Sequence, residues 1–137
     1  MYVTNRRAER ALLTSQGIFY LATGLWPVLH RSSFERVTGP KTDFWLVRTV
    51  GAVLATVGAA MLVGAARGTA TPETRVLAVG GAAALATVDV VYAGRGRISK
   101  IYLLDAAAEL ALAAGWLASS LRRGRRGPKP PEILSGE

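Results

Sequence analysis

Apolar residues dominate four long windows of the chain, and charged residues gather mainly between them. The windows are "ALLTSQGIFYLATGLWPVL" (11–29), "FWLVRTVGAVLATVGAAMLVGAA" (44–66), "TRVLAVGGAAALATVDVVYAG" (74–94) and "IYLLDAAAELALAAGWLASSL" (101–121). Each has about the ~20 residues that a helix needs to cross the hydrocarbon core of a bilayer. A long helix on a soluble protein would show a continuous polar face, but the run 51–66 has no charge and only Thr56 as a polar side chain. The pattern predicts four transmembrane helices.

The connections between the windows predict how these helices are arranged. "RGTATPE" and "GRGRIS" are short, so each should join two neighbouring helices in a hairpin. We therefore expect an all-α fold, an integral membrane bundle of four antiparallel transmembrane helices over 1–121. Small residues at four-residue spacing should let the helix backbones approach closely in lipid. These rows are Ala60, Gly64 and Gly68; Ala78, Ala82 and Ala86; and Ala107, Ala111 and Gly115.

The first connection is the only one long enough to hold structure of its own. Ser32 and Glu35 fit the S-x-x-E capping box, which predicts one helical turn there. The "TGP" sequence that follows should end this turn, and Thr42 or Asp43 is placed to cap the second span.

Basic residues predict the orientation of the chain. The net charge is +8, and the side with both termini holds ten Lys and Arg residues against seven on the other side. The positive-inside rule then predicts cytoplasmic termini in a multi-pass protein of the cell membrane. The tail 122–137, "RRGRRGPKPPEILSGE", is basic and rich in Gly and Pro, which predicts disorder. Its expected partners are anionic lipid headgroups, and not nucleic acid.

Composition excludes several kinds of chemistry. The chain has no cysteine, which removes disulfides, thiol nucleophiles and iron–sulfur clusters, and it has one histidine, which removes multi-histidine metal sites. No nucleophile–base pair is present in the pattern. The sequence therefore predicts no catalytic residues, no metal and no cofactor. It favours a protein without enzymatic activity, and a membrane enzyme acting on a lipid headgroup stays open as an alternative.

Acidic residues inside the spans are the main functional signal. Asp89 lies near the end of the third span, and Asp105 and Glu109 share one face of the fourth. Glu109 lies about 13 Å below Lys100, near the middle of the bilayer, where a carboxylate should face the bundle and have a partner. The hairpins bring all three acids to the end of the bundle that lies under the first connection. The opposite half, around Met61, Gly80 and Ala114, shows no ionisable group in the sequence.

We expect Arg48 to be the counter-ion of one of these acids. Three interpretations of the cluster stay open: a structural ion-pair network, a ligand or proton site, and an oligomer contact. For the ligand site, the candidate residues are Arg48, Asp89, Asp105, Glu109, Tyr102, Lys41, Asp43 and His30. A mid-span tyrosine, Tyr20, also needs a hydrogen-bond partner inside the bundle.

The segments "GLWPVLHRSSFERVTGPKTDFWLVRTVG" and "DVVYAGRGRISKIYLLDAAAEL" resemble those of uncharacterised small bacterial membrane proteins with four spans. The resemblance covers the membrane part but not the tail, and it implies a fold and an inner-membrane location without an activity. DoxX-like subunits are similar in size and topology only, and no redox motif transfers from them.

The leading functional hypothesis is a non-enzymatic membrane protein with a polar pocket at one end of the bundle, which binds a small amphiphile, a lipid or a partner helix. The alternatives are a proton- or ion-coupled small transporter that acts as an oligomer, and an accessory subunit of a membrane complex. The sequence does not choose between a homo-oligomer and another membrane partner.

Overall fold

The computed structural model describes residues 2–125, which form five helices, and the side chains from residue 5 onward. The helices are α1 (Tyr2–Leu29), α2 (Arg31–Thr38), α3 (Phe44–Arg67), α4 (Pro72–Gly94) and α5 (Tyr102–Gly124). Four of them are long and apolar enough to cross a membrane: Asn5–Leu29 within α1, and all of α3, α4 and α5. The prediction of four such helices is confirmed.

The long helices extend beyond two of the predicted windows. α1 begins at Tyr2, well before the first window, and α5 continues to Gly124. The prediction of a disordered tail from residue 122 is therefore wrong for its first residues, because Arg122 and Arg123 are helical. The rest of the predicted tail, 126–137, lies outside the described residues.

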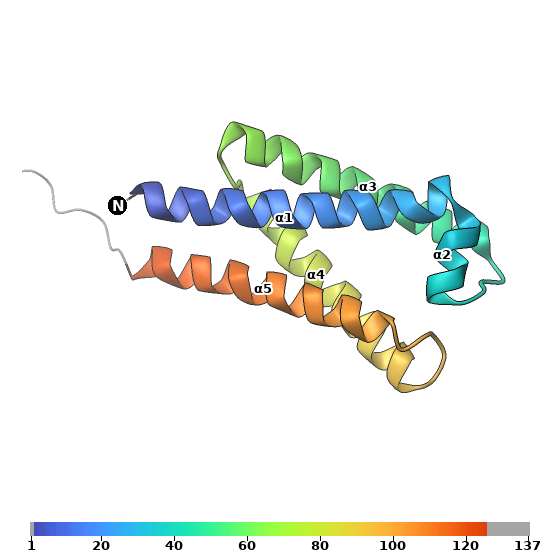
Figure 1. Cartoon of the computed structure of the whole chain (residues 1–137). Helices are drawn as coiled ribbons and strands as arrows, with labels where there is room; N and C mark the ends of the chain where they lie inside the picture. The colour runs from blue at the N-terminus through green and yellow to red at the C-terminus, as the bar shows by residue number, and fades with distance from the viewer. Residues whose placement is uncertain (1, 126–137) are drawn as a thin grey trace, which may run out of the picture.

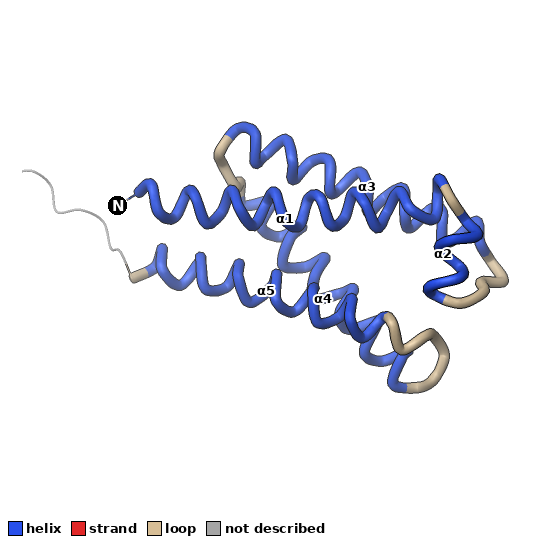
Figure 2. Tube along the Cα trace, in the orientation of Figure 1, coloured by secondary structure: helices blue, strands red, loops and turns tan. Residues whose placement is uncertain are grey.

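The helices are arranged as two pairs (Figure 1). α1 packs along α3, and α4 packs on α5, whereas α1 meets α5 less extensively and α3 meets α4 only slightly. The start of α1 and the end of α5 lie at one end of the molecule, and α2 lies at the other (Figure 1). The tube in Figure 2 shows that the connection between α4 and α5 lies at the same end as α2. Toward that end the two pairs diverge.

Glycines set the close approach of α1 and α3. Gly17 and Gly24 on α1 face Gly58 and Gly51 on α3. A Cβ atom on Gly58 would lie 2.6 Å from the backbone nitrogen of Leu21 and 2.7 Å from the carbonyl oxygen of Gly17. Both atoms are backbone, so the helices would have to move apart.

The structure uses only part of the small-residue rows expected from the sequence. Ala78, Ala82 and Ala86 are buried on one face of α4. On α3 the buried small residues are Gly51, Ala55, Gly58 and Ala65, and not Ala60. On α5, Ala107 and Ala111 are exposed. Four-residue spacing therefore found the packing face of one helix and missed it on two others.

The connection between α1 and α3 contains a helix of eight residues, which is longer than the single turn predicted and has a different cap. α2 begins at Arg31 and its N-cap is His30, whose ring accepts a hydrogen bond from the backbone nitrogen of Ser33. Glu35 accepts hydrogen bonds from Arg31 and from the backbone nitrogen of Lys41, so the predicted capping box with Ser32 is wrong. The helix ends at Thr38, as "TGP" predicted, and its C-cap Gly39 has a φ of 89°, which favours glycine. Asp43 is the N-cap of α3 by position but makes no side-chain cap bond.

We predict that Gly58→Ala lowers the free energy of unfolding by about 1–3 kcal/mol, because overpacking against backbone forces the α1–α3 pair apart. The matched control is Gly80→Ala on α4, where a Cβ meets nothing within 4 Å and the change should stay within about 0.5 kcal/mol. Unfolding of both variants by dodecyl sulfate titration in mixed micelles measures the difference. Equal stability of the two variants would contradict the close α1–α3 contact.

Candidate binding pocket between the helix pairs

A second face of α1 joins the two helix pairs through buried polar side chains. Gln16 is fully buried, and its side-chain nitrogen donates to the carbonyl oxygen of Ala78 on α4 at 2.9 Å. The indole nitrogen of Trp116 on α5 donates to the side-chain oxygen of Gln16 at 2.7 Å. One side chain of α1 therefore holds α4 and α5 at once. A buried amide that is satisfied on both sides fixes the rotation of its helix.

One turn farther along α1, Tyr20 bonds to an acid of α5. The Tyr20 hydroxyl donates to Oε2 of Glu109 at 2.8 Å, and both side chains are almost fully buried. The mid-span position of Tyr20 predicted a hydrogen-bond partner inside the bundle, and the structure shows that this partner is Glu109. The bond also partly compensates the burial of the Glu109 carboxyl group.

The far end of the same α1 face carries an ionic cluster that the sequence did not predict. Oε1 of Glu9 accepts from Arg75 at 2.8 Å and from Arg123 at 2.7 Å, and Glu9 itself is 4 % exposed. Ser119 and Asn5 complete the cluster with a hydrogen bond of 3.2 Å. A buried acid therefore lies at each end of the bundle. The signal that could have located Glu9 is its position as the only acid in a basic N-terminal segment.

A cavity of about 700 Å³ lies between the pairs at the end where they diverge. Residues of α1, α3, α4 and α5 line it, with Phe34, Val37 and Thr38 of α2 on its wall. Most of the wall is apolar, and Phe19, Leu54 and Leu85 are typical of it. We call this cavity the interhelical pocket.

Three acids lie on the wall of the interhelical pocket: Asp89, Asp105 and Glu109. Asp89 is 5 % exposed, and its Oδ2 atom is buried without a hydrogen-bond partner among the described residues. Asp105 is half-buried. The prediction that hairpins bring these acids together is therefore correct for their positions, and one of them lacks the partner that burial demands.

The remaining predicted site residues are placed differently. Tyr102 lines the pocket, and the Nζ atom of Lys41 lies 5.4 Å from the centre of its ring. Arg48 is exposed, and its guanidinium lies over the ring of Phe44 at 5.4 Å.

The counter-ion prediction is wrong, because Arg48 forms no ion pair with an acid within the described part of the chain. Asp43 and His30 are exposed and do not line the pocket.

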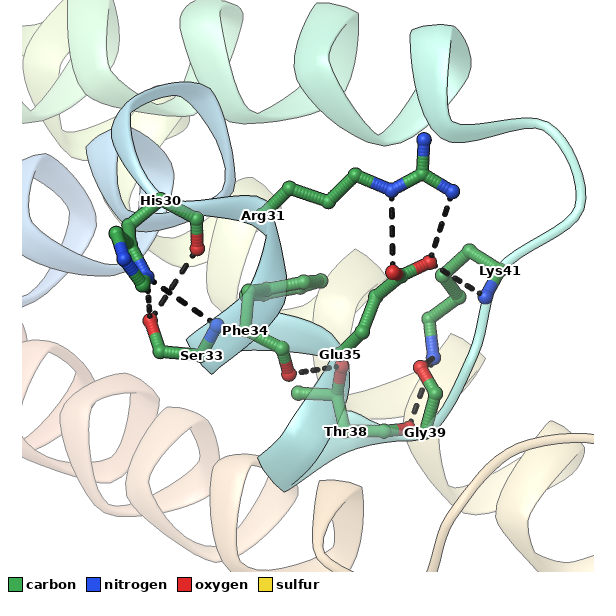
Figure 3. Close-up of polar contacts among 8 residues, drawn as sticks. All are labelled: His30, Arg31, Ser33, Phe34, Glu35, Thr38, Gly39 and Lys41. Atoms are coloured by element: carbon green, nitrogen blue, oxygen red, sulfur yellow. Dashed lines mark hydrogen bonds and ion pairs between the residues drawn. The ribbon is translucent and has the colours of Figure 1, made fainter.

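Hydrogen bonds within the first connection occupy most of its polar groups (Figure 3). Ser33 bonds to Nδ1 of His30 at 2.7 Å and accepts from the indole nitrogen of Trp26 at 2.8 Å. Lys41 donates from Nζ to the carbonyl oxygens of Thr38 at 2.8 Å and Gly39 at 3.1 Å. The connection is thus held to α1 and to itself, and its apolar side covers the pocket.

Glu35 organises the outer side of α2. Arg31 donates to its two oxygens at 3.1 and 3.3 Å, and the backbone nitrogen of Lys41 donates to Oε1 at 3.0 Å. The hydrogen bonds from Arg31 hold the pKa of the Glu35 carboxyl below its usual value. Burial lowers the pKa of Lys41, and the nearby Glu35 opposes that effect.

The structure offers no cluster for a metal in the part of the chain that it describes. No group of three His, Cys, Asp or Glu side chains there is arranged to hold an ion, and the three acids of the pocket wall are no exception. Comparison of the chain with family models, with curated proteins and with solved structures gives no match.

We predict that Tyr20→Phe lowers the free energy of unfolding by about 1–3 kcal/mol, because Glu109 loses its hydrogen-bond donor while staying buried. Tyr92→Phe is the matched control, since Tyr92 on α4 is 44 % exposed and the loss of its hydroxyl leaves no buried group unpaired. Dodecyl sulfate titration of both variants gives the comparison. A Tyr20→Phe protein as stable as the control would show that the Tyr20–Glu109 bond does not join the pairs.

Proposed function

We propose that this chain is a multi-pass membrane protein that binds a small amphiphile in the interhelical pocket and catalyses no reaction. In this proposal α1, α3, α4 and α5 cross the bilayer as antiparallel spans. The side with both termini carries more Lys and Arg, so it lies in the cytoplasm. The pocket then lies in the outer half of the membrane, with α2 at its surface.

The single observation that supports binding best is the pocket itself. Its volume of about 700 Å³ falls in the range typical of sites for small molecules, roughly 300–1,000 Å³. Apolar walls with a few polar groups at one side match a molecule with a hydrocarbon tail and a polar head. Leu54 and Leu85 would contact the tail, and Asp89 and Asp105 would meet the head.

The packing at the other end of the bundle favours binding over transport. Leu13, Met61 and Trp116 are fully buried and form one apolar core beside the pocket. Beyond them Glu9 is tied to Arg75 and Arg123. A route across the membrane would have to open both the apolar core and the Glu9 ion pairs. Entry of an amphiphile from the lipid would not require either of them to open.

We predict that Ala108→Phe, which fills part of the pocket, weakens amphiphile binding by roughly tenfold through steric exclusion. Ala108 lines the pocket, and the matched control Ala111→Phe adds the same ring one turn away on the exposed face of α5. The protein is placed in phosphatidylcholine nanodiscs and titrated calorimetrically with dodecanol and with dodecyltrimethylammonium. Empty nanodiscs give the heat of simple partitioning.

The native protein and the Ala111→Phe variant should bind at least one of these probes with one molecule per chain. Binding no stronger than to empty nanodiscs would overturn the proposed function. So would an Ala108→Phe variant that binds as the native protein does.

A further inference from the structure

We infer that the ligand of the interhelical pocket is a cationic amphiphile, such as a lipophilic amine or quaternary ammonium compound. This inference rests on the proposed function and adds the chemistry of the headgroup. Its basis is the charge of the pocket wall, where three acidic side chains stand among the lining residues and no basic one does.

Asp89 carries the argument, because its position is costly without a ligand. It continues the buried face of α4 that begins with Ala78, Ala82 and Ala86, so the helix cannot turn it outward without exposing that face. Its Oδ2 atom is buried and has no hydrogen-bond partner within the described residues. A buried carboxylate oxygen without a donor is strongly unfavourable unless a cation or a donor reaches it from the pocket.

The ionisable groups that act electrostatically on Asp89 are themselves acids. They are Asp105, whose carboxyl group lies within hydrogen-bonding reach of the Asp89 side chain, and Glu109, which already accepts the Tyr20 hydroxyl. Three carboxyl groups on one wall give a negative potential in a low-dielectric setting, where charges act more strongly than in water. An anionic headgroup would be repelled, and a neutral one would leave the acids uncompensated.

The two basic side chains predicted for this site are engaged elsewhere. Lys41 donates to Thr38 and Gly39, and it lies beside the ring of Tyr102 rather than on the pocket wall. Arg48 is exposed over Phe44. Neither compensates Asp89, so the position for a cation is left to the ligand.

The experiment compares dodecyltrimethylammonium with dodecanol, which has the same tail and no charge. Both are titrated into the full-length protein in phosphatidylcholine nanodiscs, with empty nanodiscs subtracted. The native protein should bind the cation roughly tenfold or more tightly than the alcohol. Asp89→Asn should remove most of this preference for the cation over the alcohol. Asp43→Asn, which alters an exposed acid outside the pocket, should keep the preference intact.

A second variant makes the test independent of how Asp89→Asn folds. Asp105→Asn on the same wall should reduce the cation preference as well, and circular dichroism establishes the helix content of each variant. Equal affinity of the native protein for cation and alcohol would overturn the cationic headgroup. If the native protein binds the cation and the alcohol equally and Ala108→Phe abolishes the binding of both, the proposed amphiphile pocket would still be supported. Retention of the full preference in Asp89→Asn and Asp105→Asn would also overturn the inference.

Discussion

The arrangement of this protein depends on α1 having two different packing faces. One face carries Gly17 and Gly24 and lies against the backbone of α3. The other carries Glu9, Gln16 and Tyr20, which bond to α4 and α5. In the proposed membrane location, apolar packing has little driving force between helices, so close backbone contact and buried hydrogen bonds are the interactions that can hold them together. α1 supplies both, and the α4–α5 pair is held to α3 largely through it.

The interhelical pocket exists because the hydrogen bonds from α1 to α4 and α5 stop before the C-terminal end of α1. The Tyr20–Glu109 bond is the last of the series, and beyond it Thr23 and Trp26 line the cavity instead of bonding to α5. α3 and α4 make little contact that could close the gap. The divergence of the pairs therefore follows from the position of one hydrogen bond along α1, and α2 covers the space that results.

The polar groups around the pocket divide into satisfied and unsatisfied sets. In the first connection, Glu35, Lys41 and His30 use their hydrogen-bonding capacity within α2 and its flanks. On the opposite wall, Asp89 keeps an oxygen that has no hydrogen-bond partner in the part of the chain that the structure describes. Local violations of hydrogen-bond satisfaction concentrate at functional sites in folded proteins, because a ligand can supply the missing partner. The polar group that a ligand could satisfy therefore lies on the acidic wall and not in the charged connection.

The sequence by itself determined which segments become long apolar helices, since uninterrupted apolar runs have few other structures. It also determined that the short connections bring Asp89, Asp105 and Glu109 to one end of the molecule. The short helix at Arg31–Thr38 and its glycine end were also predictable from local turn chemistry. The partners of the charges were not, because rotation and tilt of each helix depend on both of its packing faces together. Only the tertiary structure decided that Arg48 lies over Phe44, that Gly58 meets Gly17, and that Glu109 pairs with Tyr20. The contacts of Gly58 and of Glu109 join residues far apart in sequence, and a one-dimensional pattern holds no information on the angle between two helices.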